Sequence, residues 1–160
     1  MAILQGIKQD PFQGFKFRVV IDGFRSAGFK KCSGLKEETE VVEYREGTDP
    51  VTMHKLPGLT KYENIVLERG MSRNSDFQKW REDIVNIGLS GNLAPDGLPS
   101  PIFRRNVMIE LFDKSGLKVK EWEVYDAWPA VLEIGALDAE SNDVLIETLE
   151  LANEGFSQTM

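Results

Sequence analysis

His54 is the only histidine in the sequence, so any Ser-His-Asp or Cys-His arrangement for nucleophilic catalysis would have to include it. The residues around it, VTMHKLP, hold no GxSxG, HExxH or paired-cysteine motif that would place a nucleophile or a metal beside the imidazole. Cys32 is the only cysteine, which excludes an internal disulfide and predicts a buried, inert thiol. The sequence therefore predicts a loop contact or an exposed side chain for His54, and no catalytic residue.

Acidic side chains gather in the segment from Lys36 to Glu46. They could form an acid/base pair or a calcium site, but the ligand spacing of an EF-hand is missing, and no apolar pocket that would raise a carboxyl pKa is evident. Two interpretations remain: a solvated acidic face, or the wall of a channel whose like charges would repel passing anions. The residues concerned are Glu37, Glu38, Glu40, Glu43 and Glu46.

Length and charge limit the kinds of protein that this chain can be. Its 160 residues, 41% of them hydrophobic, suit one domain spanning 1–160 that needs neither metal nor disulfide. Nineteen basic against 26 acidic residues give a net charge of −7, which argues against general nucleic-acid binding and against a basic membrane surface. Neither GxxxxGKS/T nor GxGxxG occurs, so no phosphate-binding loop and no cofactor are expected. We expect folding in a reducing cytosol, because the N-terminus has no signal-peptide pattern and no window reaches the ~18 apolar residues of a membrane span.

Period-2 alternation marks the first strand. Residues 15–21 (FKFRVVI) place four apolar side chains on one side and basic side chains on the other, as in a half-buried strand. Asp22-Gly23 is a turn signal, and it predicts that residues 29–35 pair back with this strand as a hairpin.

The next segment is less suited to a monomer. Residues 36–46 form a strand without a wholly apolar face, residues 47–57 form a charged loop that contains His54, and residues 62–69 form a fourth strand. Exposed strand edges invite pairing with another chain. A neighbouring copy that covers the edge and the loop would remove this liability, so the pattern favours assembly over catalysis.

The period changes to that of a helix over residues 75–87. Its apolar residues fall within an arc of about 80° at 100° per residue, Ser75 offers an N-cap oxygen, and Gly88 suits the position after the helix. The apolar residues are Phe77, Trp80, Ile84 and Ile87, and the polar face carries Gln78, Lys79, Glu82 and Asn86.

Strands dominate the rest of the chain. Residues 106–112 and 117–125 predict a second hairpin, and residues 131–137 and 144–152 predict two more strands after the Gly- and Pro-rich loop at 89–101. About eight strands and one helix make a mainly β protein: a small barrel or sandwich of antiparallel strands with one α-helix on its side.

The segment VEYREGTDPVTMHKLPGLTKYENIVLERG, from Val42 to Gly70, resembles the tube proteins of contractile phage tails, R-type bacteriocins and extracellular contractile injection systems. The opening DPFQGFKFRVVIDG, the element Asp126-Ala127-Trp128-Pro129 and the ending ETLELANEGF resemble the same family in the same order. The family pattern often has a His before the final Glu-Gly, where this chain has Asn153.

This resemblance implies a structural subunit and no enzyme. Subunits of the family close into six-membered rings, their strands join a continuous sheet around the lumen, and the rings stack head to tail inside a contractile sheath. It also implies contacts with baseplate or tube-initiator proteins, a lumen that could carry protein or DNA, assembly in the bacterial cytoplasm, and possible release in a phage tail-like particle. The part that reaches the next ring corresponds here to Arg45, Glu46, Asp49, His54, Lys55, Leu56 and Pro57.

Further expectations and alternatives accompany this reading. The acidic strand would line the bore, and the polar helix face at Gln78, Lys79, Glu82 and Asn86 would meet the sheath. Alternatively, the chain is a tube initiator or adaptor at the baseplate, or it is a small ligand-binding or enzymatic β-barrel that uses His54 and the glutamates.

Overall fold

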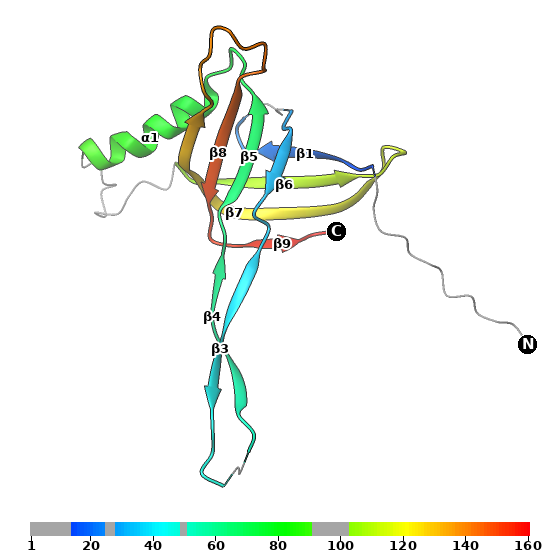
Figure 1. Ribbon diagram of the computed structural model, residues 1–160, viewed down its shortest axis with the longest axis vertical. Helices are drawn as coiled ribbons and strands as arrows, with labels where there is room; N and C mark the ends of the chain where they lie inside the picture. Colours follow the sequence, from blue (N-terminus) through cyan, green and yellow to red (C-terminus); the bar gives the residue numbers. More distant parts are fainter. Residues whose placement is uncertain (1–13, 25–27, 49–50, 91–102) are drawn as a thin grey trace, which may run out of the picture.

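The computed structural model describes residues 14–24, 28–48, 51–90 and 103–160, which form nine strands and one helix (Figure 1). Every strand pairing among them is antiparallel. The predicted fold class, mainly β with one helix, is confirmed. The elements are β1 (Lys16–Ile21), β2 (Lys31–Ser33), β3 (Glu37–Tyr44), β4 (His54–Tyr62), β5 (Ile65–Gly70), α1 (Asp76–Ser90), β6 (Arg105–Phe112), β7 (Lys118–Ile134), β8 (Ile146–Ala152) and β9 (Phe156–Gln158).

Strand β7 joins the two halves of the main sheet, whose order is β1-β6-β7-β8-β5-β2 with β9 also paired to β7. The first half of β7 pairs with β6 and β9, and its second half pairs with β8. Between them Asp126 has a φ of 50°, and the register shifts between Pro129 and Val131. The strand therefore bends there, as Figure 1 shows. The prediction of separate strands at 117–125 and 131–137 was wrong, because this irregularity bends the chain without ending the strand.

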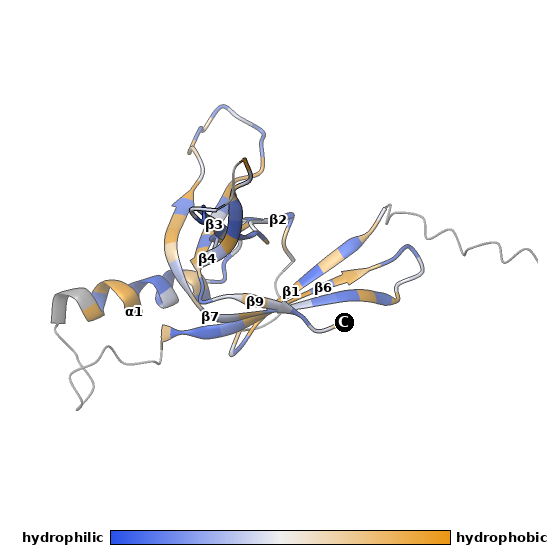
Figure 2. Cartoon of the chain, turned by 90° about the horizontal axis from the view of Figure 1, so that it is seen from below, coloured by the Kyte–Doolittle hydropathy of each residue, from blue (hydrophilic) through white to orange (hydrophobic). Residues whose placement is uncertain are grey.

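The core lies between the two halves of the sheet. Buried and half-buried positions alternate along β5 and β8, and Figure 2 shows hydrophobic and hydrophilic residues alternating along strands of the sheet. The buried strand residues are Val19, Ile21, Ile65, Leu67, Val107, Ile109, Val124, Ala127, Leu149 and Leu151.

Helix α1 packs on this core through Phe77 and Trp80, which are 2% and 1% exposed. The Trp80 indole Nε1 donates a hydrogen bond to the Phe103 carbonyl oxygen at 2.6 Å. At the start of the helix the Asn74 side chain accepts a hydrogen bond from the Asp76 amide at 2.8 Å. The predicted helix and its apolar face are confirmed, but the helix runs to Ser90, past the glycine expected to end it.

The predicted hairpin between residues 15–21 and 29–35 was wrong. Strand β1 pairs with β6 from Lys16↔Phe112 to Ile21↔Val107, while β2 pairs with β5. Alternation shows which face of a strand is buried, but it does not identify the neighbour. Here the long β6 offers six pairs, whereas β2 has only three residues.

Candidate functional site

Strands β3 and β4 form a two-stranded sheet of their own, which we call the arm, residues 37–62. It projects from the body along the longest axis of the molecule (Figure 1). Every residue of both strands is exposed except the half-buried Tyr62. Eight residues of extended strand span about 26 Å. Because an isolated hairpin is marginally stable in water, the arm is suited to a partner that covers it.

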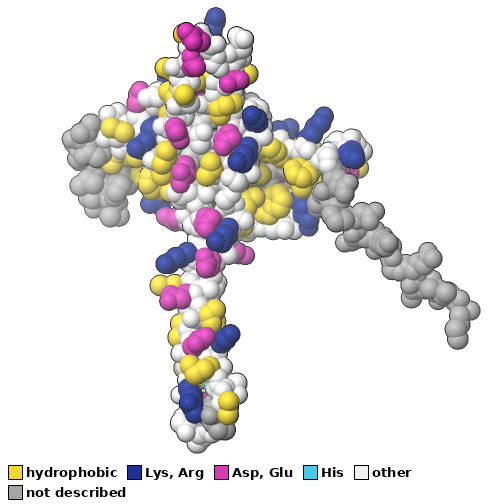
Figure 3. All heavy atoms as spheres, viewed as in Figure 1, with side chains coloured by type: hydrophobic (Ala, Val, Ile, Leu, Met, Phe, Trp, Pro, Cys, Tyr) yellow, Lys and Arg dark blue, Asp and Glu magenta, His cyan; other side chains and the backbone are white. Residues whose placement is uncertain are grey.

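Apolar side chains lie on both faces of the arm. On one face Val42 is opposite Leu56, and the ring of Tyr44 stacks on that of His54 with centroids 5.2 Å apart. On the other face Val41 is opposite Pro57. Val41, Leu56 and Leu59 are 59%, 51% and 71% exposed. Figure 3 shows hydrophobic side chains interspersed with charges of both signs along the arm.

The segment from His54 to Pro57 was expected in a loop, and the structure corrects this. These residues begin β4, so the predicted loop at 47–57 is reduced to the connection between Tyr44 and His54. A proline is tolerated in a strand that pairs on one side only. Gly58 sits at a register shift, and a Cβ there would lie 3.1 Å from the Glu40 carbonyl oxygen, so the strands approach closely at this point.

The root of the arm is fixed to the body by contacts with the β8–β9 turn. The Asn153 side chain donates to the Glu63 carbonyl oxygen at 2.9 Å and accepts from the Gly155 amide at 3.0 Å. The rings of Tyr62 and Phe156 meet edge to face, with centroids 5.5 Å apart. These contacts set the direction in which the arm leaves the sheet.

The family is decided by comparison of the sequence with models of known families. The model of the T4-like virus tail tube protein gp19 matches residues 13–157. This chain belongs to that tail tube family. A comparison with curated proteins gave no match.

Several solved structures have the same fold. A chain in the sheath-tube complex of an extracellular contractile injection system (PVC, extended state) is 22% identical over 94% of this chain and 93% of its own, with a TM-score of 0.72. One in the anti-feeding prophage (AFP) baseplate is 27% identical over 90% and 91%, with a TM-score of 0.69. Hcp1 of Flavobacterium johnsoniae is 13% identical over 89% and 94%, with a TM-score of 0.53.

In this tail tube chain, the residues expected to reach the next ring lie together. Arg45 and Glu46 follow the end of β3, and His54, Lys55, Leu56 and Pro57 begin β4 directly across from it. Asp49 lies outside the described residues. The imidazole of His54 is on the arm, whereas Cys32 lies in β2 of the body, so the structure does not bring these two side chains together as a dyad.

The acidic residues of β3 are all exposed but do not share a face. Strand alternation puts Glu37 and Glu43 on one side and Glu38 and Glu40 on the other. Lys36 contacts this cluster: its Nζ lies 2.9 Å from Glu63 and 3.7 Å from Glu38, and the hydrogen bond to Glu63 raises the pKa of the Lys36 amine. Within the described residues no group of three or more His, Cys, Asp or Glu side chains is placed to hold a metal ion.

Helix α1 turns its predicted polar face outward. Gln78, Lys79, Glu82 and Asn86 are exposed, on the side away from Phe77 and Trp80. Val85 is 45% exposed on the same helix, an apolar surface residue that the sequence reasoning missed. Among the described helices, none is long and apolar enough to cross a membrane.

Among the described residues, the cavities include two that were not foreseen. One, of 410 Å³, opens between β1 and β2, the two ends of the strand order, and is lined by Phe15, Phe17, Cys32, Leu35, Ile109 and Trp122, among others. Burial in this apolar seam raises the pKa of the Cys32 thiol to about 11, in keeping with the inert thiol expected. The other lies in the loop between β7 and β8. Neither has a signal in sequence periodicity, because both arise from the way distant strands meet.

Proposed function

We propose that this chain is the repeating subunit of the inner tube of a contractile tail or injection system. In this proposal copies close into six-membered rings, and the rings stack head to tail into a hollow, rigid conduit inside a contractile sheath. The observation that carries it is the arm: a two-stranded sheet, exposed along both strands, that projects from the body. A hairpin of this kind becomes stable when a second protein surface covers it.

The asymmetry of the subunit supports stacking in one direction. The arm is present at one end of the longest axis and absent from the other (Figure 1). A contact between two different surfaces repeats without limit when its geometry does not close a ring. Strands β1 and β2 end the strand order of the described residues, so their outer edges offer further surfaces for neighbours within a ring.

The arm residues are assigned to the contact between rings. Lys55 and Leu56 begin β4 at the outer part of the arm, and Leu56 is 51% exposed. Burial of such side chains against the next ring would stabilise stacking by about 25 cal/mol per Å² of apolar area. The proposed contact residues are Arg45, Glu46, Asp49, His54, Lys55, Leu56 and Pro57.

We assign one face of β3 to the bore. Because Glu38 and Glu40 share a side of the strand and Glu37 and Glu43 share the other, one of these two pairs faces the lumen in a closed tube. Glu46 follows the strand, on the distal part of the arm. Either arrangement gives the bore an acidic wall. DNA or acidic protein cargo has the same sign of charge, so it would pass through the bore without binding to the wall.

The remaining assignments follow from the same proposal. The exposed face of α1, with Gln78, Lys79, Glu82 and Asn86, meets the sheath, and tube growth begins on baseplate or initiator proteins. The subunit needs no catalysis, cofactor or membrane contact of its own. It assembles in the bacterial cytoplasm and leaves the cell only as part of a released particle.

The test is negative-stain electron microscopy of the purified chain over a series of protein concentrations. Rings or rods with a central hole are expected, and a double variant, Arg45→Glu with Lys55→Glu, should leave rings but few rods. A charge-matched control on the body, Lys79→Glu with Lys114→Glu, should stack normally. Monomers at every concentration, with or without a baseplate template, would contradict the proposal; rods of normal length from the arm variant would contradict the assignment of these residues.

A further inference from the structure

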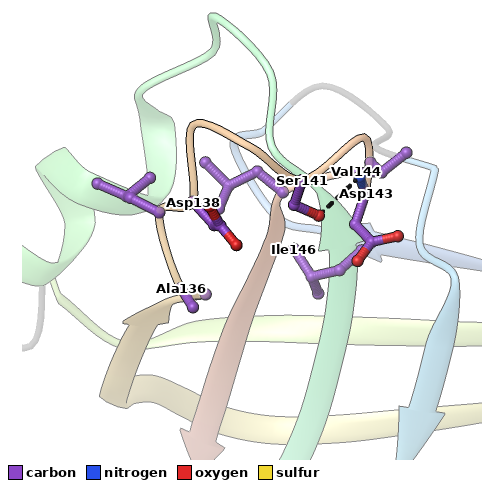
Figure 4. A pocket seen from close by; sticks show the side chains of 9 residues that line it. Ala136, Asp138, Ser141, Asp143, Val144 and Ile146 are labelled. Atoms are coloured by element: carbon purple, nitrogen blue, oxygen red, sulfur yellow. Dashed lines mark hydrogen bonds between the residues drawn. The ribbon is translucent and has the colours of Figure 1, made fainter.

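The end of the molecule opposite the arm carries a formed cavity. The loop between β7 and β8, residues 135–145, encloses 370 Å³ together with Ile146 (Figure 4). In Figure 1 this loop and the arm lie at opposite ends of the longest axis. Two copies related by a shift along that axis therefore bring the arm of one toward the loop of the other.

Hydrogen bonds give this loop a defined shape. The amides of Gly135 and Met71 donate to the carbonyl oxygens of Ile146 and Leu145, each at 2.8 Å. Within the loop, the amide of Glu140 donates to Asp138 Oδ1 at 2.9 Å, and the amide of Asp143 donates to Ser141 Oγ at 3.1 Å. A surface held in this way can receive a partner at a smaller cost in conformational entropy.

The rim of the cavity is apolar and uncovered. Leu137 and Val144 are 82% and 73% exposed, and Met71, on the segment hydrogen-bonded to the loop, is 44% exposed. The tip of the arm carries side chains of the same kind: Val51 is 89% exposed and Met53 is 48% exposed. Apolar side chains exposed at both ends of one chain are what a head-to-tail contact would bury.

Groups of opposite charge are available at the two ends. Residues 135–146 include Asp138, Glu140 and Asp143 but neither Lys nor Arg, and the one cation on the adjoining 71–75 segment is Arg73. Figure 4 shows Asp138 and Asp143 on the two limbs of the loop with Ser141 between them. The sequence of the outer arm carries two cations, Arg45 and Lys55, among three acidic residues, Glu43, Glu46 and Asp49. Contacts from these two cations to the loop carboxylates would fix the register of the two copies.

We propose that the 135–145 loop is the receptor for the arm tip of a second copy of this chain in the adjacent ring. Val51 and Met53 cover Leu137 and Val144, and Lys55 and Arg45 face Asp138 and Asp143. The proposal rests on the proposed tube function and adds the receiving surface to it.

The test is a charge exchange between the two surfaces, scored as rod length by electron microscopy without sheath. Asp138→Lys with Asp143→Lys should shorten rods about tenfold while rings remain, as should Arg45→Glu with Lys55→Glu. The four substitutions together should restore most of the length, because the signs are again opposite. Asp22→Lys with Asp83→Lys, the same change of charge at exposed positions of the body, is the matched control and should leave rod length unchanged.

The outcomes separate this proposal from the tube function. If the unmodified chain never forms rings or rods, the tube function fails; if rods form and the Asp138/Asp143 variant stacks normally, only the receptor assignment is overturned. Should a loop variant not fold, a Cys32→Ser chain carrying Val51→Cys and Leu137→Cys decides the matter. On oxidation of its rods we expect a ladder of disulfide-linked chains that either single cysteine fails to give, and absence of the ladder from intact rods overturns the proposal.

Discussion

The Nε of Arg69 donates to Glu147 Oε2 at 2.7 Å, and both side chains are almost fully buried, at 5% and 7% exposure. The pair joins β5 to β8 at the register position where these residues face each other. The Arg69 guanidinium also lies over the Phe77 ring, 3.8 Å from its centroid. One buried ion pair therefore couples the sheet to helix α1, which carries the proposed sheath surface.

Removing one partner of this pair should destabilise the subunit strongly. Glu147→Ala leaves the Arg69 guanidinium buried without its carboxylate, and we expect the free energy of unfolding to fall by about 3–5 kcal/mol. Urea denaturation of the monomeric subunit measures this. Glu68→Ala is the control: Glu68 lies 3.9 Å from the exposed Lys31, so its loss should cost about 0.5 kcal/mol. Equal losses for the two variants would show that the buried pair contributes no more than the surface pair.

Gly34, just before the arm, should tolerate no side chain. Its φ is +95°, and a Cβ there would lie 2.0 Å from the Asn64 carbonyl oxygen. Gly116 also has a positive φ, +86°, but a Cβ would meet nothing within 4 Å. Gly116→Ala should therefore cost about 1–2 kcal/mol of backbone strain, whereas Gly34→Ala should cost more, because Asn64 must also move. Thermal unfolding of the two variants compares them, and equal melting temperatures would contradict the steric argument.

Acid should weaken the sheet at Glu110. The hydrogen bond from Arg18 Nε, 2.6 Å from Glu110 Oε2, is the main reason that the pKa of this carboxyl is below its usual 4.5, and Lys118 adds to it. A carboxyl with a lowered pKa in the folded state stabilises fully above the pKa of the unfolded chain, and this contribution is lost as pH falls through the folded value.

The consequence is a difference between wild type and Glu110→Gln that depends on pH. The variant should unfold at lower urea than wild type at pH 7, and the two midpoints should converge as pH falls below 4.5 and wild-type Glu110 becomes protonated. Asp83→Asn, on the exposed side of α1, is the control and should keep a constant offset across the range. A Glu110→Gln offset that does not change with pH would mean that the ion pair with Arg18 does not stabilise the fold.

Much of the fold followed from local pattern. The apolar arc of Phe77 and Trp80 predicted α1, and the two-sided acidic strand around Glu40 predicted an element that needs a partner. Pairing was not predictable, because alternation in β1 defines a buried face and does not select β6 from the other strands. The start of β4 was missed because Pro57 and Gly58 are usual in loops, whereas here they fit a strand paired on one side with a register shift.

The candidate site, too, was only partly predictable from the sequence. The family motif placed the arm residues around Lys55, and the structure brings their described members together on the outer arm. The opposite end, at Leu137 and Val144, carries no motif. These two residues could be singled out only in the folded molecule, because they are exposed and their loop lies at the end of the longest axis opposite the arm.

Asn153 occupies the place where the family pattern often has His, and its contacts are within the chain. Its amide group bonds both the Glu63 carbonyl oxygen, at the root of the arm, and the Gly155 amide. Asn153→Ala removes both hydrogen bonds, and we expect a loss of about 2 kcal/mol in the free energy of unfolding. Asn142→Ala, at an exposed position, should cost little.

A second measurement distinguishes a hinge at the arm from general destabilisation. Amide hydrogen exchange of residues 61–64 should be faster in Asn153→Ala, because the Glu63 carbonyl no longer holds the arm root to the β8–β9 turn. Exchange in β6, which belongs to the main sheet and not to the arm, should change only by the loss of global stability. If exchange rises equally in both places, Asn153 stabilises the whole subunit and does not set the direction of the arm.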